Sequence, residues 1–284
     1  MSATIKNAIS TGVAKLKAAG VADPRNDANL LAMHVIKRDR TFLLTHGEAT
    51  LSPDQLNLYR SLIERRGSGE PLQYITGHQE FFKLDFETSP DVLIPRPETE
   101  LIVEIGMELL KDKARPFIAD IGTGSGCIVI SLLHELRQSR AVATDVSSAA
   151  LAVATRNANR YQVSDRLRLI ESDLFSALES NELFDLIVSN PPYVPAADLE
   201  GLQREVSREP QNALDGGADG LAVIRRLLNE APVFLRARGY LVFEIGFDQA
   251  ESVKRIIDSA AWELIDVRRD LQGIPRTVVL RKSN

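Results

Sequence analysis

The chain contains 284 residues, 44% of them hydrophobic, and carries a formal net charge of −5 with a sequence pI of about 5.5. This acidic balance gives no overall basic field for nucleic acid, and no apolar run reaches the roughly 18 residues of a membrane helix. The single cysteine excludes an internal disulfide framework, the four scattered histidines argue against a structural zinc site, and the first residues lack the apolar core of a signal peptide. We therefore expect a soluble cytoplasmic protein with one substantial domain and one smaller domain.

Residues 1–78 have the pattern of a small helical bundle. Apolar side chains recur at helical spacing over residues 5–16, 30–36 and 56–63. Arg60, Arg65 and Arg66 cluster at the end of the last of these helices, where they form either a solvated helix end or part of a docking surface for a macromolecular partner. Residues 73–77, which follow a break rich in glycine and proline, are expected to be a short extended piece.

A β-hairpin should connect this bundle to a second domain. Residues 80–87 have the pattern of one strand, and residues 92–94 form its partner after a proline-containing turn. We assign the linking hairpin to residues 79–96. Arg96 is placed to line the mouth of an active site, and Glu98 either does the same or belongs to an ordinary capped helix start.

Over residues 97–284, short buried strands alternate with helices, which predicts an α/β domain. The expected strands are residues 117–121, 141–144, 167–170, 186–188, 240–245, 262–267 and 277–280. The connection between the last two strands is too short for a crossover helix, so this pair should be antiparallel.

A glycine-rich loop follows the first of these strands. Asp120-Ile121-Gly122-Thr123-Gly124-Ser125-Gly126 leads directly from strand to helix, so that the backbone can approach a ligand closely and the helix start offers free N–H groups. Asp145 ends the next strand, about 20 residues further on, where a carboxylate accepts hydrogen bonds from ribose hydroxyls. The loop lacks the third glycine position of the dinucleotide fingerprint and the lysine of a phosphate loop. These features indicate a nucleoside cofactor without a pyrophosphate, and S-adenosylmethionine fits.

Asn190-Pro191-Pro192-Tyr193 follows the buried strand of residues 186–188, at the edge of the sheet where ligands bind. Because proline fixes φ and has no N–H, the Asn190 side chain and the Pro191 carbonyl can be held as two rigid acceptors, and Tyr193 adds a flat face. Two acceptors suit a planar conjugated –NH2 group, such as an amide or the exocyclic amine of adenine. They would hold its nitrogen and stabilise the charge that develops during attack on an electrophile. The alternative is an ordinary proline-containing turn.

These motifs, in this order, resemble those of the class I S-adenosylmethionine-dependent methyltransferases that modify amino groups. Further signatures resemble the release-factor glutamine methyltransferase family (HemK/PrmC); they lie in residues 69–77, 93–100, 209–210, 213–217 and 243–246. The resemblance covers the whole chain. It implies a Rossmann-like seven-stranded sheet with an antiparallel last strand pair, preceded by a helical domain that helps to dock the substrate.

The family resemblance also implies the roles of individual residues. S-adenosylmethionine, with S-adenosylhomocysteine as product, would contact Gly122, Thr123, Gly124, Ser125, Gly126, Asp145, Leu174 and Asn190. The substrate glutamine would be held by Asn190, Pro191, Pro192 and Tyr193, of which Asn190, Pro191 and Tyr193 are the catalytic candidates. Leu174 stands where some relatives have tryptophan, so it would pack against the adenine rather than stack on it. Asp173 is either an adenine contact or a loop cap. No metal is implied.

The implied reaction is methylation of the side-chain amide nitrogen, N5, of the glutamine in the Gly-Gly-Gln loop of bacterial class 1 peptide chain release factors. These factors are the expected partners. We expect no direct nucleic-acid substrate and no membrane association. Two alternatives stay open. An adenine-N6 methyltransferase acting on nucleic acid would use the same four-residue grip, and a non-catalytic scaffold would only bind the cofactor and a translation factor.

Overall fold

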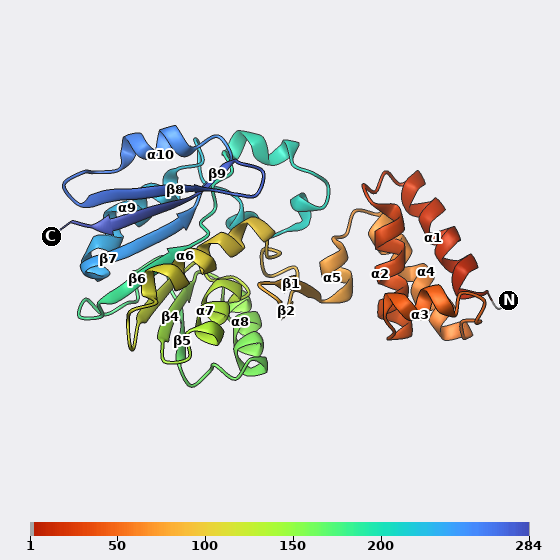
Figure 1. Cartoon of the computed structure of the whole chain (residues 1–284). Coiled ribbons are helices and arrows are strands. Elements are labelled where there is room, and N and C mark those ends of the chain that lie inside the picture. The colour runs from red at the N-terminus through yellow and green to blue at the C-terminus, as the bar shows by residue number, and fades with distance from the viewer. Residues whose placement is uncertain (1–2, 284) are drawn as a thin grey trace. The chain divides into compact units, whose positions relative to one another are not determined.

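The computed structural model describes residues 3–283 and divides into two units (Figure 1). Unit 1 comprises Met1–Gly77 and Gln203–Arg208, and unit 2 comprises His78–Leu202 and Glu209–Asn284. The sequence assigned the short segment Gln203–Arg208 to the second domain, whereas in the structure it clusters with unit 1. In the described part of the chain, no helix has both the length and the apolar character that crossing a membrane requires.

Unit 1 is helical, as expected from the apolar periodicity of its sequence. Its helices are α1 (Ile5–Ala18), α2 (Pro24–Ile36), α3 (Arg40–Thr45), α4 (Pro53–Gly67) and α5 (Leu72–Thr76). The start of α4 is fixed by a reciprocal cap, in which Ser52 Oγ accepts from the Gln55 backbone N–H and the Gln55 side chain accepts from the Ser52 N–H. Leu16 and Leu31, both fully buried, belong to the core that these helices share. The three predicted helices are confirmed, and α3 is additional.

Helix α5 replaces the extended piece that the sequence predicted over residues 73–77, so that prediction is wrong. Pro71 precedes the helix with an extended backbone, and Gly77 ends it in the left-handed conformation with φ +80°. The N–H of Gly77 closes the turn on the Gln73 carbonyl at 2.7 Å. The proline and the glycine therefore bracket a single helical turn, which is too short to leave a periodic signal in the sequence.

Arg66 lies neither on a solvated helix end nor on a docking surface, which corrects both sequence interpretations of this residue. It is only 7% exposed, and its guanidinium donates to Asp27 at 2.7 Å and to Glu205 at 2.8 Å. Its burial is possible because two carboxylates compensate its charge. Arg65 donates to Glu70 nearby. Within unit 1, Arg66 thus ties α2 and α4 to the segment Gln203–Arg208.

Unit 2 begins with a hairpin whose strands differ from those predicted. Strands β1 (His78–Phe81) and β2 (Leu84–Glu87) pair antiparallel, so the single strand expected over residues 80–87 is two strands. The turn falls at Phe82 and Lys83, which have φ of +50° and +62°. Side chains of this type rarely adopt such angles, and the sequence therefore gave no turn signal. Residues 92–94 are not a strand, and the predicted pairing of this segment is wrong.

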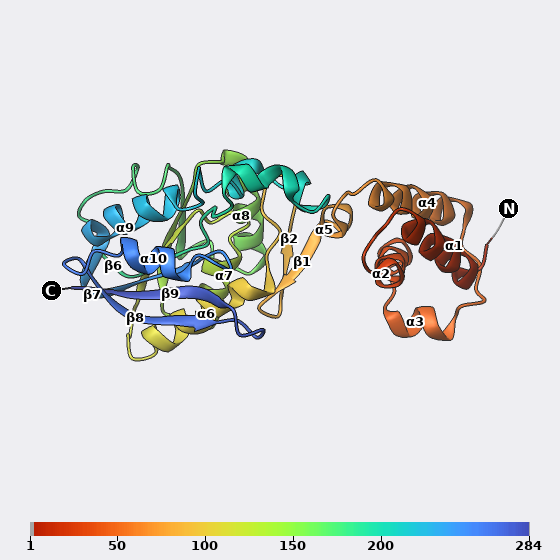
Figure 2. The same ribbon diagram turned by 90° about the horizontal axis from the view of Figure 1, so that it is seen from above.

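The centre of unit 2 is a seven-stranded sheet in the order β5-β4-β3-β6-β7-β9-β8. Its strands are β3 (Phe117–Ile121), β4 (Arg140–Asp145), β5 (Leu167–Glu171), β6 (Phe184–Ser189), β7 (Leu235–Glu244), β8 (Trp262–Arg269) and β9 (Pro275–Lys282). β3 to β7 run parallel, whereas β9 pairs antiparallel with both β7 and β8. Figure 2 labels the last three strands, with β9 beside β7 and β8. The seven-stranded α/β fold with an antiparallel last strand pair is confirmed.

Helices cover both faces of this sheet. The helices of unit 2 are α6 (Glu100–Leu110), α7 (Cys127–Glu135), α8 (Ser148–Arg160), α9 (Ala222–Phe234) and α10 (Ala250–Ile256), with short 3-10 turns at Pro97–Thr99, Ala196–Gly201 and Gln211–Ala213. Alternate strand residues face opposite sides: Leu186 belongs to a core cluster with residues of α6, α7 and α8, and Ile187 belongs to one with residues of α9 and α10. Because both faces are covered, ligands can reach the sheet only at its ends.

One buried carboxylate joins three segments of unit 2. Asp185 on β6, with a side chain 1% exposed, accepts from the Phe117 N–H at 2.9 Å, from Lys113 at 2.9 Å and from Arg236 at 2.8 Å. Burial by itself raises the pKa of Asp185, but these three donors outweigh it and hold the pKa below its ordinary value. The lowered pKa means that the carboxylate stabilises the fold above the pKa of the unfolded state and that this contribution is lost as the pH falls through the folded-state pKa.

Asp185→Asn should lower the free energy of unfolding by about 2–4 kcal/mol at neutral pH, because it removes the charge that compensates two cations. Chemical denaturation at a series of pH values measures this loss. The difference from the wild type should shrink below about pH 4, where the unfolded-state carboxylate takes up a proton. Asp165→Asn, in an exposed loop of the same unit, is the control and should change little. A difference between Asp185→Asn and wild type that is constant with pH would contradict the role of the charge.

Candidate active site

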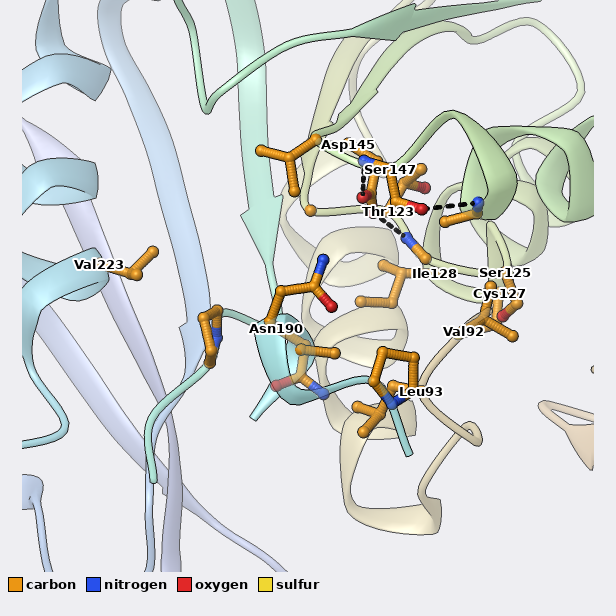
Figure 3. A pocket seen from close by; sticks show the side chains of 18 of the residues that line it. Val92, Leu93, Thr123, Ser125, Cys127, Ile128, Asp145, Ser147, Asn190 and Val223 are labelled. Carbon is orange, nitrogen blue, oxygen red and sulfur yellow. Dashed lines mark hydrogen bonds between the residues drawn. The ribbon is translucent and has the colours of Figure 1, made fainter. Parts of the chain in front are cut away.

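A cavity lies at the carboxyl end of the sheet, where β3, β4 and β6 finish (Figure 3). It lies within unit 2 and is lined by Asp91, Val92, Leu93, Pro95, Arg96, Thr99, Gly122, Thr123, Gly124, Ser125, Cys127, Ile128, Asp145, Val146, Ser147, Ala150, Ser172, Asp173, Leu174, Asn190, Pro192, Pro210, Asn212, Ala213, Val223 and Arg226. Segments far apart in sequence thus meet at one edge, as expected for an open α/β sheet. The walls combine aliphatic side chains with a few polar groups, as in small-molecule sites.

The glycine loop forms one wall of the cavity. Gly122 and Gly124 have φ of +74° and +55°, and a Cβ atom at either position would meet no other atom within 4 Å. The missing side chains therefore leave space for a ligand close to the backbone. Gly126, with φ +81°, differs because a Cβ there would lie 2.7 Å from the Ile130 side chain. Gly126 thus serves the packing of α7, while Gly122 and Gly124 open the cavity.

Two carboxylates hold this loop in place. Asp145, at the end of β4, accepts from the Gly124 N–H at 2.8 Å and from the Ser147 N–H at 2.9 Å, as the dashed lines in Figure 3 show. Burial raises the pKa of Asp145, and the backbone donors oppose this rise. Asp120 accepts from the Thr123 hydroxyl at 2.7 Å, and its burial raises its pKa to about 7. Each carboxylate oxygen has a second lone pair, so Asp145 can also accept from hydroxyls of a ligand in the cavity.

The two arginines that line the cavity are each paired with a carboxylate. Arg226 donates to Asp173 at 2.9 Å, and Arg96 forms an ion pair with buried Glu209, which also accepts from the Ile94 N–H. Asp173 is therefore an ion-pair partner at the rim, a role that the sequence alternatives did not include. Paired cations are poor anchors for a phosphate group, so the cavity suits a nucleoside without phosphates better than a nucleotide.

Asn190 lies at the end of β6 with its amide in the cavity (Figure 3). Its Nδ2 donates to the Thr99 hydroxyl at 3.1 Å, and Thr99 in turn donates to Glu244 at 2.6 Å. The Tyr193 hydroxyl donates to the other oxygen of Glu244 at 3.0 Å. Burial raises the pKa of both Tyr193 and Glu244. One buried carboxylate thus connects the first and last residues of the Asn-Pro-Pro-Tyr motif.

The structure brings most of the predicted site residues to this cavity. Those that line it are Gly122, Thr123, Gly124, Ser125, Asp145, Leu174, Asn190 and Pro192. Gly126, Pro191 and Tyr193 are not among the lining residues: Pro191 is buried, and Tyr193 is directed to Glu244. Arg96 lines the cavity, whereas Glu98 does not.

Sequence reasoning gave no role in the site to three residues that the geometry places there, although Thr99 and Glu244 fall within the signature segments 93–100 and 243–246. Thr99 and Arg226 line the cavity, and Glu244 lies behind Asn190. Thr99 and Glu244 are separated by 145 residues in sequence, and Arg226 is 53 residues from its partner Asp173. No local pattern links such residues, and only the strand order brings them together.

Comparison with known proteins decides the family. A family model described as "PrmC N-terminal domain" matches residues 7–77, and one described as "Methyltransferase small domain" matches residues 99–245. The release factor glutamine methyltransferase of Koribacter versatilis is 43% identical over 280 residues, which cover 98% of this chain and 99% of that protein. The chain belongs to the release factor glutamine methyltransferase family. The family resemblance read from the motifs is therefore confirmed.

Other relatives agree with this assignment. The release factor glutamine methyltransferase of Moorella thermoacetica is 45% identical over 251 residues, covering 88% of each chain. Among solved structures, a ribosomal protein L11 methylase from Lactobacillus delbrueckii subsp. bulgaricus matches with a TM-score of 0.50 and 20% identity, over 72% of this chain and 90% of that one. This structural likeness shows the methyltransferase fold. Together, these findings make the chain a methyltransferase of this family.

Proposed function

We propose that this enzyme transfers a methyl group from S-adenosylmethionine to the side-chain amide nitrogen of the glutamine in the Gly-Gly-Gln loop of bacterial class 1 release factors. The observation that carries the proposal is the position of Asn190, whose amide stands in the cavity beside the glycine loop and Asp145. The names of the relatives support the substrate class. We place the reaction in the cytoplasm, where release factors act, with the helical residues of unit 1 helping to dock the partner.

The residues of the cavity fit S-adenosylmethionine. Asp145 offers carboxylate oxygens to ribose hydroxyls, and the open space at Gly122 and Gly124 admits a ligand close to the backbone. Leu174 and Ile128, which both line the cavity, supply aliphatic surface for a purine. Bound there, S-adenosylmethionine would supply an electrophilic methyl group on a sulfonium.

The chain's own residues would act on the substrate amide. Asn190 Oδ1 and the Pro191 carbonyl would accept the two N–H bonds of the glutamine amide, which fixes the nitrogen and favours the charge that develops on it. Tyr193 would limit the position of the substrate glutamine side chain from one side. As the new N–C bond forms and the S–C bond breaks, the nitrogen becomes acidic and releases its proton to water, so no strong base is required.

Incubation of the purified chain with radiolabelled S-adenosylmethionine and a purified class 1 release factor tests the proposal. We expect label on the release factor and none on a variant in which the Gly-Gly-Gln glutamine is replaced by asparagine. Absence of label on the unaltered factor would contradict the proposal and favour the alternative of a non-catalytic scaffold. Label on DNA or RNA, falling steeply with salt, would instead identify an adenine-N6 methyltransferase.

A further inference from the structure

A buried chain of hydrogen bonds stands behind Asn190. Thr99 is 2% exposed and Glu244 is 1% exposed, so neither is satisfied by solvent. The contacts run from Asn190 Nδ2 to Thr99 Oγ1 at 3.1 Å and from Thr99 Oγ1 to Glu244 Oε2 at 2.6 Å. All of these residues belong to unit 2, and Thr99 also lines the cavity.

The chemistry of the three groups sets the direction of these hydrogen bonds. While Glu244 is ionised, its carboxylate only accepts hydrogen bonds, so the single proton of the Thr99 hydroxyl is donated to it. The oxygen of Thr99 can then only accept, and the group that donates to it must be the –NH2 end of the Asn190 amide. The opposite orientation of the amide would leave its oxygen against an oxygen that has no proton to offer.

We propose that Thr99 and Glu244 are positioning residues that hold the Asn190 amide with its oxygen toward the substrate. This inference rests on the proposed function and adds residues to it. A reversed amide would present an –NH2 group to the –NH2 group of the substrate, and two donors would face each other. The orientation of one amide thus decides whether the site grips the substrate nitrogen or repels it.

The surroundings of Glu244 act on its charge in opposite directions. Burial raises the pKa of Glu244 above its ordinary value, and the hydroxyls of Thr99 and Tyr193 and the charge of Arg276 oppose that rise in part. The charge of Glu98 acts in the other direction. Because Tyr193 donates to Oε1 and Thr99 to Oε2, the same carboxylate fixes both ends of the four-residue motif.

Three variants separate this role from simple support of the fold: Thr99→Val, Thr99→Ser and Glu244→Gln. Valine keeps the shape of threonine but removes the hydroxyl, and serine restores it. Thr99→Val should lower kcat for methyl transfer from S-adenosylmethionine to a class 1 release factor by about 10- to 100-fold, because a small displacement of a gripping group has effects of this size. Thr99→Ser should recover most of that loss. Glu244→Gln should lower kcat as Thr99→Val does. The new amide can donate to Thr99 Oγ1, and the Thr99 hydroxyl would then donate to Asn190 and reverse the direction of the hydrogen bonds.

Calorimetric titration with S-adenosylmethionine and thermal unfolding complete the experiment. The inference predicts that Thr99→Val binds S-adenosylmethionine as the wild type does, with the loss confined to kcat. Wild-type kcat in a folded Thr99→Val, or a loss that serine does not recover, would overturn it. If Thr99→Val does not fold, wild-type kcat in Glu244→Gln would overturn it and a reduced kcat would support it. A wild-type chain that is inactive toward the release factor would contradict the proposed function, and this inference with it.

Discussion

Asn190→Ala should reduce kcat for methylation of a class 1 release factor by about 10²- to 10³-fold, the usual cost of removing one group that stabilises developing charge. The substitution removes the only side-chain acceptor that the account assigns to the substrate amide. The glycine loop and Asp145 stay in place, so the affinity for S-adenosylmethionine should fall much less than kcat. Steady-state kinetics together with calorimetric titration of the cofactor measure both quantities.

Asn181→Ala is the matched control for this variant. Asn181 lies exposed in a loop of the same unit, outside the residues that line the cavity, and its replacement should leave both quantities unchanged. Near-normal turnover by Asn190→Ala would reject the role given to the motif. A loss that appears only in cofactor affinity would move Asn190 from substrate binding to cofactor binding.

Gly124→Ala should weaken the binding of S-adenosylmethionine at least about tenfold, which corresponds to about 1.4 kcal/mol. In the free protein, a Cβ atom at this position meets nothing within 4 Å, so the added methyl group causes no clash with the chain itself. It would occupy the space at which the account places the cofactor. The left-handed φ of +55° adds about 1–2 kcal/mol of backbone strain, which lowers stability without touching the ligand.

Gly273→Ala separates these two effects. Gly273 also has a left-handed φ, +80°, with nothing within 4 Å of an added Cβ, but it lies outside the cavity lining. Both variants should therefore lose a similar amount of stability in chemical denaturation. Only Gly124→Ala should lose cofactor affinity. Equal cofactor binding by the two variants would place the nucleoside away from the glycine loop.

Local sequence patterns predicted the parts of the site that depend on neighbouring residues. The glycine loop, Asp145 and Asn190 each follow a short buried strand, and parallel strands end at the same edge of the sheet, so their meeting at one cavity followed from the pattern. The antiparallel pairing of the last two strands followed in the same way from the length of their connection.

Features that depend on tertiary contacts were not accessible to such patterns. A buried Arg66 has the same local sequence as a solvated one, because its partners Asp27 and Glu205 lie far away along the chain. Glu244 lies in the signature of residues 243–246, but that pattern gives no sign of its contact with Thr99, which only the fold creates. The turn at Phe82 and Lys83 was missed because its residues are atypical of that conformation.

A crystal structure of the chain with S-adenosylhomocysteine and a Gly-Gly-Gln peptide tests the central claim most directly. We expect the glutamine amide nitrogen to lie about 3 Å from both Asn190 Oδ1 and the Pro191 carbonyl oxygen, facing the sulfur atom. A glutamine bound elsewhere, or residues 190–193 turned away from the sulfur, would contradict it.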